Sequence, residues 1–107
     1  MPPGPFDVEV QRTPGRLHVR PMGDLDIATV DRVRTAVAAR EAGEALELDL
    51  SGLEFLDTSG LQLLVELHRD ARADGHELSI VRGTHNVHRV FEMAGLDRVL
   101  PFTGGEA

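Results

Sequence analysis

Segments with the period of a β-strand and segments with the period of an α-helix alternate along this chain. The segments with alternating or short apolar runs are residues 6–11, 16–20, 46–50 and 78–81. The segments with apolar residues at helical spacing are residues 27–41, 59–73 and 87–94. A strand, a helix and a second strand in succession normally form a parallel pair with a right-handed crossover. The order β-β-α-β-α-β-α predicts an α/β fold, with a mixed sheet of about four to five strands and helices packed against it.

Turn and cap residues set the expected ends of these segments. Residues 13–15, Thr-Pro-Gly, predict a turn that returns the second strand antiparallel to the first, and residues 21–23 predict the end of that strand. Asp26 is a candidate N-cap for the first helix, with Ile27 as the first residue of its apolar stripe. Residues 98–101 are the candidate last edge strand, because they end in a proline that lacks a ladder donor.

Length and composition bound the function. At 107 residues the chain is the size of one domain, which we expect to span residues 6–102 between tails at 1–5 and 103–107. The absence of Cys excludes a disulfide framework, a Cys-based zinc site and thiol catalysis. A net charge of −7 argues against nucleic acid as a direct partner, and no apolar run is long enough to cross a membrane. The start of the chain lacks the pattern of a signal peptide, so we expect the protein in the cytoplasm.

The stretch before the second helix passes from a strand to a helix through a polar turn. Ser59 lies at the expected start of that helix, where free N–H groups and the helix dipole favour negative charge. A phosphate on its hydroxyl would add about −1.5 to −2 charges at pH 7, and Gly60 would leave the hydroxyl uncrowded. The spacing alone favours a structural role, because Ser59 with Gln62 matches a capping box, and Asp57 and Thr58 are also good N-caps. The two interpretations are compatible, since a capping serine can still be phosphorylated.

Three passages resemble the STAS domain, a family named for sulphate transporters and anti-sigma factor antagonists. Residues 46–61 contain an apolar strand that ends in Asp-Leu-Ser-Gly and continue to Asp-Thr-Ser-Gly-Leu, which is similar to the hallmark of that family. Residues 23–26, Gly-Asp-Leu-Asp, resemble the turn before its first helix, and residues 87–100 resemble its closing helix and last strand. The likeness covers residues 6–102 in the family's order and implies a STAS-like fold.

The resemblance implies an anti-sigma factor antagonist, which is a regulatory protein and not an enzyme. At the position of Ser59 the family carries a serine that accepts a phosphoryl group from an anti-sigma factor that is also an ATP-dependent serine kinase. The unphosphorylated antagonist binds this partner and releases the sigma factor, the phosphorylated form dissociates, and a serine phosphatase restores the first state. The partner holds the ATP, so the resemblance implies no cofactor for this chain. The residues expected at the partner surface are Asp24, Asp26, Asp57, Thr58, Gly60, Leu61 and Gln62.

The roles of single residues at this surface stay open. Asp57 either orients the Ser59 hydroxyl or caps the turn, and Asp26 either contacts the partner or caps the first helix. Gln62 stands where many family members carry a small residue and is expected to affect the choice of partner, while Thr58 is a second candidate acceptor. The alternative function is a STAS interaction subunit of a transport or stress-signalling complex that is never phosphorylated.

Other chemistry finds less support in the sequence. His85 and His88 are three residues apart and could share a helical face, but no third ligand follows at a convincing spacing. The histidines are therefore expected to be exposed or half-buried polar residues, and no metal is expected. The Asp-Thr-Ser-Gly run is not the Gly-x-Ser-x-Gly turn of a serine hydrolase, and the chain contains no phosphate-binding glycine loop.

Overall fold

The computed structural model describes residues 6–103 and contains six strands and three helices within that range. In chain order they are β1 (Asp7–Thr13), β2 (Arg16–Leu25), α1 (Val30–Val37), β3 (Ala45–Asp49), β4 (Leu53–Leu56), α2 (Thr58–Asp74), β5 (Leu78–Val81), α3 (His85–Met93) and β6 (Phe102–Thr103). The α/β class and the succession of the main elements are therefore confirmed, with one strand more than the upper estimate. Residues 1–5 and 104–107, assigned above to tails, lie outside the described residues.

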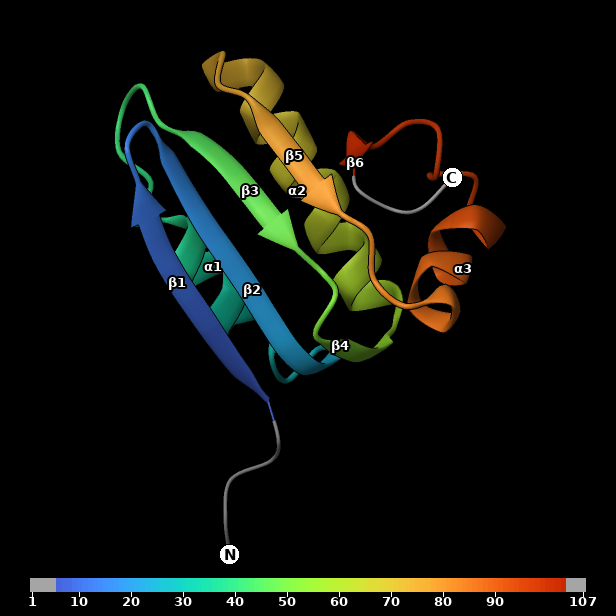
Figure 1. Cartoon of the computed structure of the whole chain (residues 1–107). Coiled ribbons are helices and arrows are strands. Elements are labelled where there is room, and N and C mark those ends of the chain that lie inside the picture. Colours follow the sequence, from blue (N-terminus) through green and yellow to red (C-terminus); the bar gives the residue numbers. More distant parts are fainter. Residues whose placement is uncertain (1–5, 104–107) are drawn as a thin grey trace, which may run out of the picture.

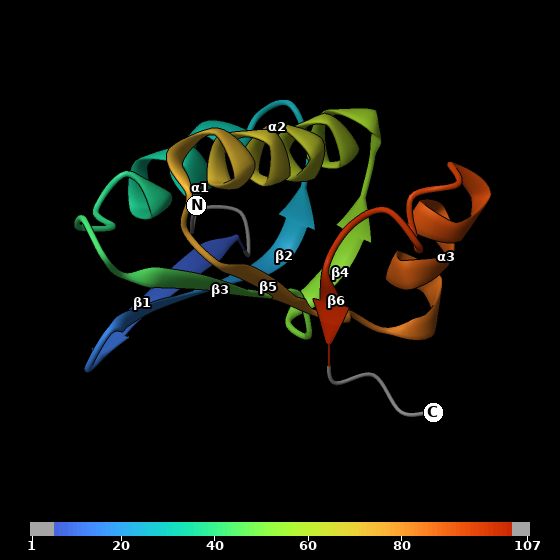
Figure 2. The same ribbon diagram turned by 90° about the horizontal axis from the view of Figure 1, so that it is seen from above.

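The sheet is mixed, with the strand order β1-β2-β3-β5-β6, and β4 pairs with the far end of β2 (Figure 1). The hairpin of β1 and β2 is antiparallel, whereas β2–β3, β3–β5, β5–β6 and β2–β4 are parallel. The parallel pair of β3 and β5 across α2 is the unit expected from residues 46–81. Helices α1 and α2 cover one face of the sheet, and α3 lies beyond its end beside β4 and β6 (Figure 2).

The core lies between this sheet and the two covering helices. It consists of aliphatic residues with two phenylalanines, and its largest fully buried side chains are Phe91, Leu17, Leu25, Leu46, Leu48, Leu50, Leu53, Leu63, Leu64 and Ile80. Apolar burial of this kind is the main force that holds such a domain together. No helix in the described part of the chain has the length and apolar character needed to cross a bilayer.

Strand β2 runs further than the sequence predicted. It continues through residues 21–23 to Leu25, because it changes neighbours on one side, from β3 at residues 16–19 to β4 at residues 23–25. Pro21 falls in the gap between the two parallel ladders, where neither ladder requires its missing N–H. The proline therefore marks a change of partner within the strand rather than its end.

Helix α1 is shorter than the expected segment 27–41, and Asp26 is not its N-cap. The backbone of Asp26 closes a turn over residues 26–29, and the N-cap residue is Thr29, whose side chain makes no capping hydrogen bond. Ile27 lies in this turn and is 76% exposed, so its assignment to the buried stripe was wrong. The apolar spacing of α1 could be extended back to Ile27 because the turn over residues 26–29 leads directly into the helix.

The two outer strands also differ from expectation. Phe6 is buried and Val8 half-buried, but Val10 is 49% exposed, because β1 is an edge strand that is paired on one side only. The last strand is β6 at Phe102–Thr103 rather than residues 98–101, which follow α3 in a turn. Thr103, placed in the tail by sequence, therefore belongs to the sheet.

Candidate functional site

The start of α2 is built around Asp57. This residue has an extended backbone, and its carboxylate Oδ1 accepts hydrogen bonds from the N–H groups of Ser59 at 2.9 Å and Gly60 at 3.3 Å. The carbonyl of Asp57 accepts the first helical hydrogen bond, from the N–H of Leu61 at 3.0 Å. Asp57 is therefore the N-cap, and the capping box that the sequence suggested for Ser59 and Gln62 is not formed. Of the two roles left open for Asp57, the structure shows the cap.

Ser59 is the second residue of α2 and is half-buried. It therefore lies in the first turn, where the positive end of the helix dipole favours an anion. The turn follows directly on β4, and the N–H of Asp57 donates to the carbonyl of Leu25 at 3.3 Å, which ties the start of α2 to the end of β2. The sequence thus places the serine on a rigid junction of two strands and a helix rather than on a free loop.

Gly60 is buried, and its lack of a side chain is a packing requirement. A Cβ at this position would lie 2.9 Å from Leu56 Cγ and 3.2 Å from the Leu25 carbonyl oxygen. The close approach allows the first turn of α2 to sit against β4 and β2. The structure therefore gives a different reason for this glycine from the open access to Ser59 that the sequence suggested.

The loop after β2 lies beside the start of α2. In the parallel pair of β2 and β4, Asp24 is opposite Phe55 and Leu25 is opposite Leu56, so residues 24–26 and residue 57 reach the same edge. Asp24 is exposed, and its carbonyl accepts a hydrogen bond from Thr29 Oγ1 at 2.8 Å. The structure therefore brings together the two acidic loops that lie about thirty residues apart in sequence.

The carboxylate of Asp26 has a local structural role. Its Oδ1 accepts a hydrogen bond from the N–H of Ala28 at 3.0 Å, and its carbonyl accepts from the N–H groups of Thr29 and Val30. Asp26 is half-buried, in contrast to Asp24. Of the two aspartates, Asp24 is therefore the better placed to meet another molecule.

An open groove runs along α2 from its first turn. Thr58 and Gln62 are exposed and Leu61 is half-buried, and all three line the groove, whose volume is about 420 Å³. Its remaining lining residues are Val65, Glu66, Arg69 and Leu96. The last of these comes from the turn after α3, so the groove has one wall on α2 and one on that turn. Leu61, Val65 and Leu96 make much of this surface apolar.

One side of the groove is held by an ion pair between the two covering helices. Arg34 on α1 donates two hydrogen bonds to the carboxylate of Glu66 on α2. They come from Nε and Nη2, each at 3.0 Å. This two-point contact lowers the pKa of the Glu66 carboxyl below its usual value, chiefly through the hydrogen bonds from Arg34. Both side chains are partly exposed, so the pair adds little to the free energy of unfolding. Its main effect is to fix α1 and α2 relative to each other.

Two exposed apolar residues beside the site were missed by the sequence analysis. Ile27 follows Asp26 and is 76% exposed, and Phe55 stands opposite Asp24 and is 51% exposed. The pairing of β2 with β4 shifts register at Gly23 and Asp24, which leaves Glu54 without a partner in that ladder and interrupts the alternation of β4. A register shift of this kind leaves no signal in a strand of only four residues.

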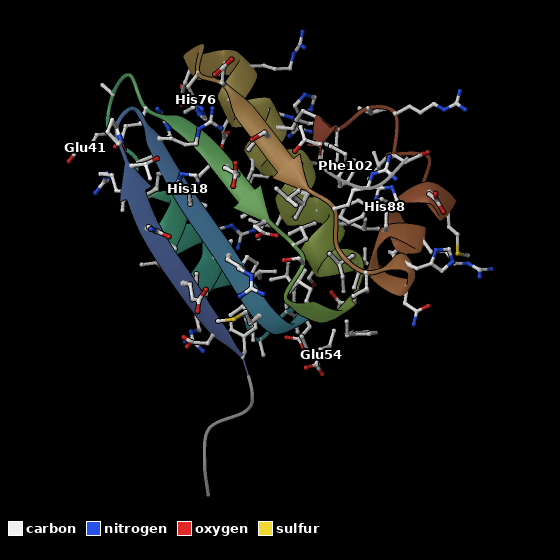
Figure 3. All side chains as sticks on the ribbon, in the orientation of Figure 1. His18, Glu41, Glu54, His76, His88 and Phe102 are labelled. Atoms are coloured by element: carbon white, nitrogen blue, oxygen red, sulfur yellow. The ribbon has the colours of Figure 1, made fainter. Side chains whose placement is uncertain are left out.

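The histidines do not form a second centre. His85 is exposed but His88 is buried, which contradicts the expectation that all five are exposed or half-buried. Within residues 6–103, no three side chains of the types that bind metals gather at one place. Figure 3 shows His18 and His76 on other parts of the molecule, away from the turn of α3 that holds His88.

Comparison with known proteins adds the family context. The family model of the STAS domain matches residues 7–105. The anti-sigma F factor antagonist of Paenibacillus polymyxa is 32% identical over 105 residues, which cover 94% of this chain and 89% of that protein.

Solved structures share the fold. An anti-sigma factor antagonist from Mycobacterium paratuberculosis superposes with a TM-score of 0.81 at 24% identity, over 94% of this chain and 86% of that one. The anti-sigma factor antagonist SpoIIAA in its unphosphorylated form gives a TM-score of 0.74 at 22% identity, over 94% of this chain and 88% of that one. At these identities the superpositions establish the architecture, which is that of the sheet and helices described above.

Proposed function

This chain belongs to the STAS domain family, and on that premise we propose that it is an anti-sigma factor antagonist controlled by phosphorylation of Ser59. Its partner is an anti-sigma factor that is also a serine kinase. The unphosphorylated chain binds this partner and displaces the sigma factor, and the phosphorylated chain does not. The chain is a substrate and a switch, and the kinase supplies both the ATP and the catalysis. Because that partner consumes ATP, the exchange belongs in the cytoplasm.

The observation that carries the proposal is the position of Ser59 in the capped first turn of α2. Phosphorylation needs a hydroxyl that a kinase can approach, and Ser59 is partly exposed at a junction that Asp57 holds in shape. In the transfer, the serine oxygen forms a bond to the γ-phosphorus of ATP, ADP leaves, and the hydroxyl proton is lost. The helix dipole favours the resulting dianion, so the fold tolerates the modification.

The charge of the surroundings explains why the modification would end binding. The phosphate adds to a surface that already carries Asp24, Asp26 and Asp57, on a chain with a net charge of −7. A partner that buries the neutral serine would have to desolvate a dianion beside these carboxylates, which is costly without a matching cation. The expected effect is a local loss of association, without refolding of the domain.

The residues around Ser59 divide into supports and contacts. Asp57 and Gly60 shape the turn, while Asp24, Thr58, Leu61 and Gln62 are available to a partner. Within this surface Gln62 and Leu61 line the groove along α2 and are suited to set which kinase is bound. A serine phosphatase that recognises the same turn would return the chain to its binding form.

The proposal is tested by incubating the chain with its cognate anti-sigma factor kinase and ATP, and measuring the intact mass. We expect one added phosphate, which is lost in Ser59→Ala and retained in the matched variant Thr58→Ala. Addition that persists in Ser59→Ala and is lost in Thr58→Ala would move the acceptor by one residue. A chain that binds the kinase but never gains mass would support the alternative of a constitutive interaction subunit.

A second measurement separates charge from shape. Ser59→Asp introduces a carboxylate at the acceptor position, and Ser59→Asn introduces a neutral side chain of nearly the same size. By calorimetry against the kinase we expect Ser59→Asp to bind at least about tenfold more weakly than Ser59→Asn. Equal affinities of the two variants would rule out repulsion of charge as the basis of the switch.

A further inference from the structure

His88 is a buried polar side chain without a hydrogen bond. It is 6% exposed, and among the described residues neither Nδ1 nor Nε2 has a hydrogen-bond partner. A neutral imidazole always carries one N–H donor, and leaving a buried donor unpaired is destabilising. Because this arrangement costs free energy, it calls for an explanation in the surroundings of the ring.

The ring of His88 is enclosed by aromatic side chains. It meets Phe102 of β6 edge to face, with ring centroids 4.7 Å apart, and it lies 6.1 Å from Phe91 on its own helix. Phe91 and Phe102 are themselves 5.0 Å apart at a steep angle, so the three rings form one cluster. Figure 3 shows His88 on α3 beside Phe102. The cluster is the contact that joins α3 to the end of the described chain.

Residues 96–103, which we call the closing segment, are also held by the pairing of β6 with β5 and by the burial of Leu100 in the core. The segment begins with a turn, in which the N–H of Leu96 donates to the carbonyl of Phe91, and it ends with the two residues of β6. These pair with β5 through Ile80–Phe102 and Val81–Thr103. The side chain of Leu100 is buried. Local opening of so short an edge strand is cheaper than global unfolding.

The charged groups that act on His88 come from the segment after β5, from α3 and from the closing segment. Arg82 after β5 and His85 on α3 oppose a positive charge on the ring, whereas Glu92 on α3 and Asp97 in the closing segment favour one. Burial is the largest influence, and the pKa of His88 is lowered from its usual value. The folded state therefore holds the imidazole neutral.

We propose that His88 is an acid-sensitive latch, and that its protonation releases the closing segment from α3. A protonated ring carries two N–H donors and a full charge, and neither has a partner inside the aromatic cluster. The open state places the ring in water and satisfies both donors. Protonation thus favours the open state, and the sheet with α1 and α2 stays folded.

The direction of the effect follows from the lowered pKa. Above the ordinary histidine value of about 6.5 the ring is neutral in both states, and the latch is fully closed. Below that value the open state takes up a proton and the closed state does not. The opening constant then rises by up to about tenfold for each pH unit, until the pH reaches the lowered pKa of the closed state.

The latch has a consequence for the groove along α2. Leu96, the first residue of the closing segment, lines that groove together with Thr58 and Leu61. Release of the segment would remove one wall beside the acceptor serine. This last step rests on the proposed function, whereas the opening itself is a property of the free chain.

The test is hydrogen exchange of the full chain at pH values from 5.5 to 7.5, with each rate divided by the intrinsic rate at that pH. We expect normalised exchange in residues 85–103 to rise by up to about tenfold between pH 7.5 and 5.5, with no rise in β3. The variant His88→Phe should abolish the rise. The matched control His85→Gln, which removes an exposed histidine one turn earlier, should retain it.

Three results would overturn the latch. They are exchange in the closing segment that does not depend on pH, a rise of equal size in β3, and a rise that survives in His88→Phe. If the larger phenylalanine ring prevents folding, His88→Leu removes the titrating group with less volume and is judged by the same criteria. No partner is present in these measurements, so their failure leaves the proposed function untouched, and failure of Ser59 phosphorylation leaves the latch untouched.

Discussion

Helices α2 and α3 begin with the same local device and present opposite surfaces. Asp57 and Thr84 both have extended backbones, and each accepts a hydrogen bond from an N–H group in the first turn that follows. After Asp57 the first turn of α2 carries the half-buried Ser59, whereas the first turns of α3 bury Val87 and His88. The capped helix start is therefore a structural unit, and by itself it does not define a functional site.

The neighbours of each helix make the difference. The start of α2 shares its edge with the acidic residue Asp24 and two exposed apolar side chains, and it opens onto a groove. At the start of α3, Thr84 and the first two helical residues are exposed, but a Cβ at Gly83 would meet the Leu50 carbonyl oxygen, and Val87 and His88 turn into the interior. We expect variants at the two helix starts to differ because α2 begins beside a groove, whereas α3 leads directly into the core.

Substitution of a close-packed glycine should be most damaging at α3. A Cβ at Gly83 would lie 2.9 Å from the Leu50 carbonyl oxygen, which is backbone and cannot move alone. At Gly60 the nearest atom is the side chain of Leu56, and the backbone oxygen of Leu25 is less crowded at 3.2 Å; alanine also regains up to about 1 kcal/mol of helix propensity, which offsets part of the packing cost. We expect Gly83→Ala to cost about 2–3 kcal/mol and Gly60→Ala about 1 kcal/mol or less in urea unfolding. A larger loss at Gly60 would show that α2 has the more rigid start.

Exposed apolar residues should matter for binding only at the α2 end. If Ile27 and Phe55 belong to the partner surface, Ile27→Ser or Phe55→Ser should weaken binding to the kinase by about tenfold, with unchanged unfolding midpoints. The matched control Met93→Ser removes a strongly exposed apolar residue from α3 and should leave the affinity unchanged. An equal loss in all three variants would mean that the partner also contacts α3.

The sequence was informative where a feature is local. The segment ending at Asp49, the helix after it and the polar turn at Ser59 could all be predicted, because apolar period and cap residues act within a few positions. The capping role suggested for Ser59 was wrong, because the N-cap is Asp57, two residues earlier. Both residue types are good caps, and the path of β4 decides between them.

Features that depend on distant partners could not be predicted. The extension of β2 past Pro21 requires β4 as a second neighbour, and the exposure of Phe55 follows from a register shift in that pairing. The burial of His88 requires Phe102 to return from the end of the chain. In each case the residue type suggested the more frequent outcome, and a long-range contact reversed it.

The strengths of the two caps should differ as their geometry does. Asp57 accepts two hydrogen bonds, at 2.9 and 3.3 Å, whereas Thr84 accepts one at 3.4 Å. We expect Asp57→Ala to lower the free energy of unfolding by about 1 kcal/mol and Thr84→Ala by about half as much. Asp57→Asn retains an acceptor and should lose less than Asp57→Ala in the same denaturant experiment. If Thr84→Ala is the more damaging, the cap at α3 contributes more than its geometry indicates.

The smallest effect is expected from the ion pair that distinguishes α2 from α3. Arg34 and Glu66 join α2 to α1, and both side chains are partly exposed, so Glu66→Gln should lower the thermal midpoint by roughly 2 °C at neutral pH. The pKa of Glu66 is lowered in the fold, so its contribution is present above the unfolded value of about 4.3 and is lost as the pH falls through the lowered pKa. The difference between Glu66→Gln and the native chain should therefore shrink as the pH falls below the unfolded value, and vanish only below the lowered pKa of Glu66. The matched variant Asp70→Asn, at an exposed position of the same helix, should leave the thermal midpoint at neutral pH unchanged. If the difference in thermal midpoint persists in acid, Glu66 acts through packing in the groove wall. The ion pair with Arg34 would then not be what holds α2 in place.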